Sequence, residues 1–110
     1  MKGTYLGEFE ELVLLVVAAQ NQDAYGISVM EEIKSEIGRS VNISAVHSSL
    51  RRIETKGFVK SEMGGATSER GGRRKRYFRI TQGGLAVLNL IKEQRNQLWN
   101  RVPDFSLQIG

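Results

Sequence analysis

The chain has 110 residues, of which 40% are hydrophobic, and a net charge of +4. This length and composition predict one folded domain with a modest core rather than a disordered chain. The absence of cysteine excludes disulfides and thiolate-bound metals, and the single histidine, His47, argues against a histidine zinc site or a catalytic triad. We therefore expect a protein that is not an enzyme and that carries no metal and no cofactor.

The first predicted element is a helix over residues 6–19, where apolar residues recur with helical spacing. Its longest apolar run, residues 12–19, is about half of what a membrane-spanning helix needs. Three acids, Glu8, Glu10 and Glu11, precede this run, whereas a signal peptide would carry positive charge there. These acids also suit the positive end of a helix dipole. The pattern predicts a buried helix, no membrane segment and a cytoplasmic protein.

A second helix is expected over residues 24–37, after a turn in which Asp23 is a candidate N-cap. Gly38 stands where a left-handed residue commonly ends a helix. Gly26, in the first turn, lowers helix propensity, and the close approach of another backbone would explain its presence. We expect the first helix to be that neighbour.

A third helix is expected from a cap at Asn42 or Ser44 to Gly57. Its apolar residues follow an i, i+4, i+7 rhythm that would dock it on the first two helices. The opposite face is then polar, basic and made of small residues. The candidate binding residues of this helix are Ser44, His47, Ser48, Arg51 and, toward one side, Arg52.

Residues 58–62 and 76–80 have strand character and flank a segment rich in glycine and arginine, which predicts a hairpin with a long tip. Residues 64–79 contain six bases and one acid, a net +5, so the rest of the chain nets −1. A localised basic patch is typical of a protein that binds a polyanion, and the alternative is a solvated charged loop. The candidate bases of the hairpin are Arg70, Arg73, Arg74, Lys75 and Arg76.

An enzymatic phosphate-binding loop is a poor explanation of the same segment. No lysine followed by serine or threonine closes the glycine loop, and no helix is expected directly after Gly71 and Gly72. The glycines are better explained as conformational freedom at the tip of a hairpin.

Thr81 is the predicted N-cap of a last helix, which Pro103 would end at about Val102. Its apolar residues recur at spacings of three and four, which is the pattern of a coiled-coil seam. The seam and its flank comprise Leu88, Ile91, Arg95, Leu98, Trp99 and Val102. Because this helix follows the hairpin, away from the three-helix core, we predict that it forms a two-fold dimer. The alternative is that it folds back on its own core.

Two residues of this seam raise separate questions. Arg95 would need a carboxylate, a water or an exposed flank, since an unpaired buried charge is costly. Trp99 is either an apolar dimer contact or a surface from each subunit on which a planar aromatic ligand stacks.

The order helix, helix, helix, strand, basic tip, strand, helix predicts a mainly α fold with a small β-hairpin (α+β). This is the plan of a winged helix-turn-helix, in which the third helix enters the major groove of DNA. We expect a DNA-binding domain over residues 1–81 and a C-terminal dimerisation helix and tail over residues 82–110.

Four segments, in order, resemble the PadR-like transcriptional regulators: GEFEELVLL at residues 7–15, AYG at 24–26, SLRRIETKGFV at 49–59 and GRRKRYFRITQGG at 72–84. The resemblance covers roughly residues 6–90. It implies a dimeric winged-helix DNA-binding protein, usually a repressor and often released by a small molecule. The chain departs from the family at His47-Ser48, where Tyr-Pro is common, and at Ile43-Ser44, where Pro-Gly is frequent.

The predicted function is a sequence-specific DNA-binding transcriptional regulator that binds a pseudo-palindromic operator in double-stranded DNA as a homodimer. We expect Arg51 to contact guanine, and Arg52 to contact a phosphate or to pair with Glu54. The hydroxyls of Ser44, Ser48 and Ser49, and the charges of Lys34 and Arg39, are further candidates for phosphate contacts. The alternative function is a winged-helix module that binds another protein without DNA sequence specificity.

Overall fold

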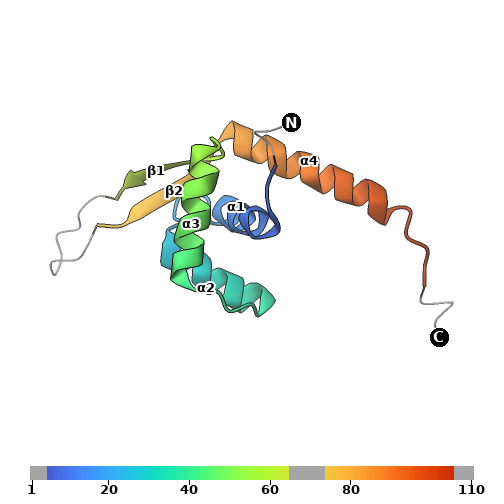
Figure 1. Cartoon of the computed structure of the whole chain (residues 1–110), viewed down its shortest axis with the longest axis horizontal. Helices are drawn as coiled ribbons and strands as arrows, with labels where there is room; N and C mark the ends of the chain where they lie inside the picture. Colours follow the sequence, from blue (N-terminus) through green and yellow to red (C-terminus); the bar gives the residue numbers. More distant parts are fainter. Residues whose placement is uncertain (1–4, 65–73, 106–110) are drawn as a thin grey trace.

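The computed structural model describes residues 5–64 and 74–105. The elements are α1 (Glu8–Gln20), α2 (Gly26–Ile37), α3 (Ile43–Thr55), β1 (Val59–Met63), β2 (Arg76–Ile80) and α4 (Gln82–Trp99). The first three helices pack together, the hairpin extends from them on one side, and α4 projects on the other (Figure 1). This order confirms the mainly α fold with a small hairpin.

Three of the predicted helix ends are confirmed. The side chain of Asn42 accepts a hydrogen bond from the Ala45 amide (2.8 Å) at the start of α3. Thr81 caps α4 in the same way, accepting from the Gly84 amide over 3.0 Å. Gly38 ends α2 in the left-handed conformation, with φ of 68°. These ends depend on neighbouring residues alone, which is why the sequence reveals them.

The predicted start of α2 is wrong. Asp23 is not the N-cap, because the chain is still extended at Ala24, whose carbonyl oxygen accepts from the Phe78 amide over 2.8 Å. Tyr25 is the N-cap residue instead, and its own amide donates to Ser28 Oγ over 2.9 Å. The helix therefore begins at Gly26, two residues later than predicted.

The expected neighbour of Gly26 is also wrong. A β carbon at this position would collide with the imidazole of His47, a side chain of α3, and not with the backbone of α1. The absence of a side chain at Gly26 thus allows α3 to cross the first turn of α2 closely.

The core lies between the first three helices, the inner face of the hairpin and the first half of α4. Its largest fully buried side chains include Leu14, Ile33, Leu50 and Ile53. The hairpin is antiparallel, with Val59 paired with Ile80 at its base and Met63 paired with Arg76 at its far end.

The prediction that the last helix lies away from the core is wrong for the first half of the helix. Val87 and Leu88 are buried, and Ile91 packs against the core cluster. Beyond Ile91 every residue of α4 is exposed, and the helix ends at Trp99 rather than near Val102. The expected dimer seam is therefore divided, since Leu88 and Ile91 pack within their own chain.

The three acids at the start of α1 each bind a different part of the fold. Glu8 pairs with Arg39 in the α2–α3 loop (2.7 Å), and Glu11 pairs with Arg95 of α4 (3.0 Å). Glu10, 8% exposed, pairs with Arg52 of α3 (2.7 Å) and with Lys56, which directly follows α3 (2.8 Å). Glu11 is thus the carboxylate that Arg95 was expected to need, and it comes from the same chain.

Replacement of Glu10 by glutamine is expected to lower the free energy of unfolding at pH 7 by about 1–3 kcal/mol, because it removes the buried carboxylate charge that pairs with Arg52 and Lys56. Burial alone raises the pKa of Glu10, but hydrogen bonds from Lys56, Arg52 and the Gly7 amide outweigh it and lower the pKa below the ordinary 4.5. A lowered pKa in the folded state means that the carboxylate stabilises the fold above pH 4.5. This contribution is lost as the pH falls through the lowered value.

Urea unfolding of the wild type and of Glu10→Gln across pH 3–7 tests this expectation, and the difference between the two should shrink below pH 4.5. Glu8→Gln is the matched control. Glu8 and Arg39 form an exposed pair, so their separation should change stability very little. A loss in Glu8→Gln equal to that in Glu10→Gln would contradict the role assigned to burial.

Candidate nucleic-acid interface

The outward face of α3 carries the predicted polar side chains. Ser44, His47 and Arg51 are exposed and Ser48 is half-buried. Ser44 lies about one helical turn from His47 and Ser48, and these lie about one turn from Arg51, so all four share one face of the helix. Within the part of the chain that the structure describes, Arg51 has no hydrogen bond or ion pair. Glu54, the partner considered for the neighbouring Arg52, instead accepts a hydrogen bond from Ser61 Oγ over 2.7 Å. The guanidinium of Arg51 is thus available to a ligand.

Arg52 lies at the side of this face and has a structural role. Its Nε donates to Glu10 of α1 (2.7 Å), and one of its terminal nitrogens donates to Ser49 Oγ (3.3 Å). The prediction that Arg52 pairs with Glu54 is wrong, because the stronger partner comes from another helix. Ser49 is fully buried, so the expectation that its hydroxyl faces a phosphate is wrong as well.

Arg39, another candidate phosphate contact, is held by α1. It donates two hydrogen bonds to Glu8, at 2.7 and 3.2 Å, and its guanidinium carbon lies 5.2 Å from the centroid of the Phe9 ring. The pair raises the pKa of Arg39, since the hydrogen bond that its guanidinium donates to Glu8 stabilises the charged form. In the described structure this charge stabilises the α2–α3 loop.

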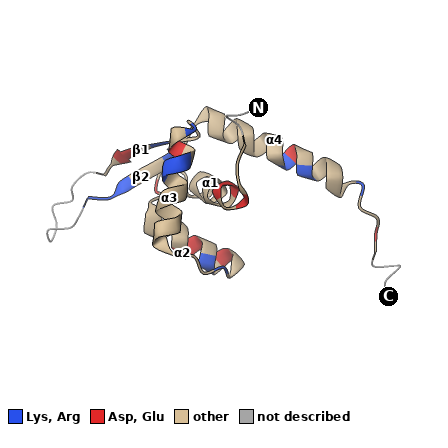
Figure 2. Cartoon of the chain, viewed as in Figure 1, with Lys and Arg blue, Asp and Glu red and all other residues tan. Residues whose placement is uncertain are grey.

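The hairpin places a second group of bases beside α3. Arg74, Lys75 and Arg76 are exposed, whereas Arg70 and Arg73 lie outside the described residues. Figure 2 shows basic residues on β2 and on the segment that leads into it.

A chain of hydrogen bonds joins this basic hairpin to α3. Arg76 donates to Ser61 Oγ over 3.0 Å, and Ser61 donates in turn to Glu54 of α3. The orientation of the basic strand is thereby coupled to the helix that carries Arg51.

The model of the "Transcriptional regulator PadR-like family" matches residues 13–90, which is more than half of the chain. The chain belongs to the PadR-like family. It is thus a DNA-binding transcriptional regulator of the winged-helix type and not an enzyme. The exposed face of α3 and the basic hairpin occupy the positions by which winged helices contact DNA.

Solved structures of PadR family regulators share this fold. The regulator from Clostridium difficile R20291 has a TM-score of 0.71 at 23% identity, over 94% of this chain and 100% of that one. The regulator from Eggerthella lenta DSM 2243 has a TM-score of 0.65 at 27% identity, over 84% of this chain and 80% of that one. None of the curated proteins compared with the chain matches it.

This PadR-like regulator also exposes apolar side chains on α1 and α4. They are Leu15 (49% exposed), Leu85 (49%), Leu90 (44%), Leu98 (64%) and Trp99 (69%), with Val102 (46%) just after the helix. Two hollows lie along α4, of about 470 Å³ beside Leu15 and Trp99 and of about 530 Å³ beside Leu90 and Leu98. Arg95 and Glu11 line both hollows. An apolar surface of this kind is typical of an interface.

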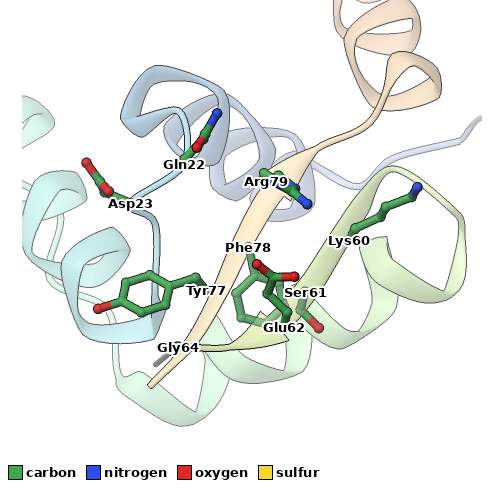
Figure 3. Close-up of a pocket in the computed structure, with 9 residues that line it drawn as sticks. All are labelled: Gln22, Asp23, Lys60, Ser61, Glu62, Gly64, Tyr77, Phe78 and Arg79. Atoms are coloured by element: carbon green, nitrogen blue, oxygen red, sulfur yellow. The ribbon is translucent and has the colours of Figure 1, made fainter. Parts of the chain in front are cut away.

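A third hollow, of about 360 Å³, lies between the outer face of the hairpin and the turn that joins α1 to α2. Figure 3 shows its mixed polar lining, with Lys60 and Arg79 near the base of the hairpin and Glu62 and Tyr77 farther along it. Among the residues that the structure describes, no group of acids, histidine or cysteine has the arrangement of a metal site. None of the described helices has the length and hydropathy to span a membrane.

Sequence reasoning also missed the contacts of Tyr25 with the hairpin in this regulator. Tyr25 lies next to Gly26 in the sequence, and nothing in this segment indicates a partner in the hairpin. In the structure its ring lies against the hairpin, 5.7 Å from the ring of Tyr77, with Lys75 Nζ 4.3 Å from its centroid. No local pattern could reveal contacts between residues some fifty positions apart.

Proposed function

We propose that this protein is a homodimeric repressor that binds a pseudo-palindromic operator and is released by a small aromatic or hydrophobic ligand. The observation that carries the proposal is the unpaired Arg51 on the exposed face of α3, beside a hairpin that holds the positive excess of the chain. Two such units related by a two-fold axis would contact half-sites about one helical turn apart, or a multiple of that distance.

The two groups of bases have different tasks in this proposal. Arg51 reads a base edge, for which a bidentate contact with guanine is the commonest geometry. Ser44, His47 and Ser48 add contacts to bases or phosphates from the same face. Arg70, Arg73, Arg74, Lys75 and Arg76 of the hairpin bind the phosphate backbone, which supplies affinity at every sequence. Arg52 acts through the position of α3, which its bond to Glu10 supports.

Selection of bound fragments from genomic DNA, repeated at several salt concentrations, tests sequence-specific binding. Enrichment of a two-fold symmetric motif supports the proposal, and the absence of any enriched motif would favour the protein-interaction module. Transcription from a template that carries the motif then separates repression from activation.

Arg51→Ala is expected to relax preference at one base pair of each half-site, at a cost of about 1–3 kcal/mol for the preferred base. Other positions of the motif should keep their preferences, because the phosphate contacts remain. The selection described above, repeated with the variant, measures this directly. A uniform loss of affinity at all sequences would instead assign Arg51 to the phosphate backbone.

The proposed dimer is supported by the exposed apolar side chains at the end of α4 and on α1. Leu98→Lys should convert the dimer to a monomer, because it places a charge in the centre of this surface. Gln97→Lys adds the same charge to the neighbouring exposed residue and is the matched control. Sedimentation equilibrium gives the mass of each variant. Dissociation by both substitutions, or by neither, would contradict an interface that depends on Leu98.

The proposed ligand would stack on Trp99, beside the 470 Å³ hollow that Leu15 and Leu85 also line. Since Trp99 is the only tryptophan, fluorescence excited selectively at tryptophan reports on this site alone. Quenching by planar aromatic compounds that also release the operator would support the proposed release. Quenching without any change in DNA affinity would contradict it.

A further inference from the structure

Tyr25 connects the start of α2 to the basic hairpin. It directly precedes α2, and the hydrogen bond from its amide to Ser28 fixes it to the first turn of that helix. Its side chain, however, contacts the hairpin. The rings of Tyr25 and Tyr77 meet edge to face, with 5.7 Å between their centroids and 77° between their planes. Aromatic pairs favour this geometry, so the contact is attractive and directional.

Lys75 completes the cluster from the basic end of the hairpin. Its Nζ lies 4.3 Å from the centroid of the Tyr25 ring, within the range of a cation–π interaction. Its carbonyl oxygen accepts a hydrogen bond from the Gly64 amide over 2.5 Å. Gly64 also lies directly against the Tyr77 ring, where any β carbon would collide with it. The residue that follows β1 and the residue that precedes β2 are thus both connected to Tyr25, Lys75 directly and Gly64 through the Tyr77 ring.

A backbone bridge supports the same arrangement nearer the core. The hydrogen bond from the Phe78 amide to the Ala24 carbonyl oxygen (2.8 Å) holds β2 beside the segment that precedes α2. Figure 3 shows the Tyr77 side chain on the outer face of the hairpin, extending toward that segment. The bridge fixes the middle of β2, and the contacts of Tyr25 extend this attachment toward the basic residues of the hairpin.

We propose that Tyr25, Tyr77 and Lys75 form a clasp that sets the direction of the basic hairpin and so positions its bases on the DNA backbone. Tyr25 is a positioning residue, because it acts through the hairpin and not by contact with DNA. A hairpin already held in its bound direction loses less conformational freedom on binding. The inference rests on the proposed function, which assigns phosphate contacts to the hairpin.

The test compares Tyr25→Leu, which removes the ring, with Tyr25→Phe, which keeps the ring and removes only the hydroxyl. In the full chain, Tyr25→Leu is expected to weaken operator binding about 5- to 30-fold for a dimer with two clasps. The slope of log affinity against log salt should not change, since the phosphate contacts remain. Tyr25→Phe should bind within about twofold of the wild type, because the ring contacts persist.

A direct structural measurement accompanies the binding data. Lys75 Nζ lies over the face of the Tyr25 ring, so the NMR signals of the adjacent Hε protons should shift upfield in the wild type and in Tyr25→Phe. The shift should be absent in Tyr25→Leu. Should Tyr25→Leu fail to fold, Tyr77→Leu with Tyr77→Phe as its control makes the same comparison from the hairpin.

Several results would overturn the clasp. In one of them, the leucine variants keep the affinity of the wild type, while alanine replacement of Arg73, Arg74 and Arg76 weakens binding. This result would leave the proposed function intact. Another is an equal loss in Tyr25→Phe and Tyr25→Leu, which would indicate contact between the hydroxyl and DNA. Unchanged affinity in the leucine variants and in the arginine variant would overturn both the clasp and the proposed role of the hairpin.

Discussion

Gly84→Ala is expected to destabilise the fold by about 2–4 kcal/mol, because its β carbon would collide with a backbone atom that cannot move away. Gly84 is buried in the first turn of α4, directly against the carbonyl oxygen of Phe58, and an added β carbon would also lie 2.8 Å from Cγ1 of Ile80. The same carbonyl oxygen accepts a hydrogen bond from the Thr81 amide over 3.0 Å. The helix would have to shift off the turn between α3 and β1.

Gly83→Ala, one residue earlier, is the matched control. A β carbon at Gly83 would lie 3.7 Å from the Gly57 carbonyl oxygen and from Thr81 Oγ1, which is ordinary van der Waals contact. Alanine is also the better helix former by up to about 1 kcal/mol, so this variant should be neutral or slightly more stable. Urea unfolding of both variants at one protein concentration measures the difference, since association also affects stability. Equal stability of the two variants would contradict the close approach at Gly84.

The sequence predicted those parts of the fold that depend on local chemistry. Asn42, Thr81 and Gly38 end or begin helices through groups within a few residues, so their side chains reveal the boundaries. The strand over residues 76–80 was also predicted with its observed bounds, because alternating apolar residues lie between a polar segment and a helix cap.

Predictions that depended on distant partners failed. Asp23 and Gly26 were interpreted through their neighbours in sequence, whereas β2 and His47 determine the structure there. Arg52 was expected to contact a phosphate or to pair with Glu54, two residues away, yet it pairs with Glu10, 42 residues away. A helical pattern identifies which face a side chain lies on but not which other element will pack against that face.

The last helix shows the same limit in another form. The regular spacing of Leu88, Ile91 and Leu98 predicts one continuous seam, and the chain uses it in two ways. Its first half completes the intrachain core, and Leu98 remains 64% exposed. Periodicity alone cannot distinguish a helix that packs in its own chain from one that packs on a second copy. The basic hairpin and the outer face of α3 were easier to predict. Charge follows directly from the residue types, and a polar face of a helix is expected to be exposed.

Combined replacement of Arg73, Arg74 and Arg76 by alanine is expected to weaken DNA binding at least about 100-fold at moderate salt, for all sequences alike. Each phosphate contact contributes roughly 0.9 to the slope of log affinity against log salt, so a dimer that loses six contacts should lose about 5 from that slope. Arg73 lies outside the described residues, so the prediction uses only its charge. Fluorescence anisotropy on operator and unrelated DNA between 50 and 300 mM salt measures both quantities.

The slope is the decisive quantity, because Arg76 also holds Ser61, and loss of that hydrogen bond would change affinity without changing the slope. The control removes Lys60 and Arg79, which stand opposite each other on the two strands near the base of the hairpin. By strand alternation they lie on the outer face, opposite Ser61 and Arg76. Alanine at both positions should leave the slope nearly unchanged. An equal decrease per charge in the two variants would mean that DNA senses only net charge, and the assignment of phosphate contacts to the hairpin bases would be wrong.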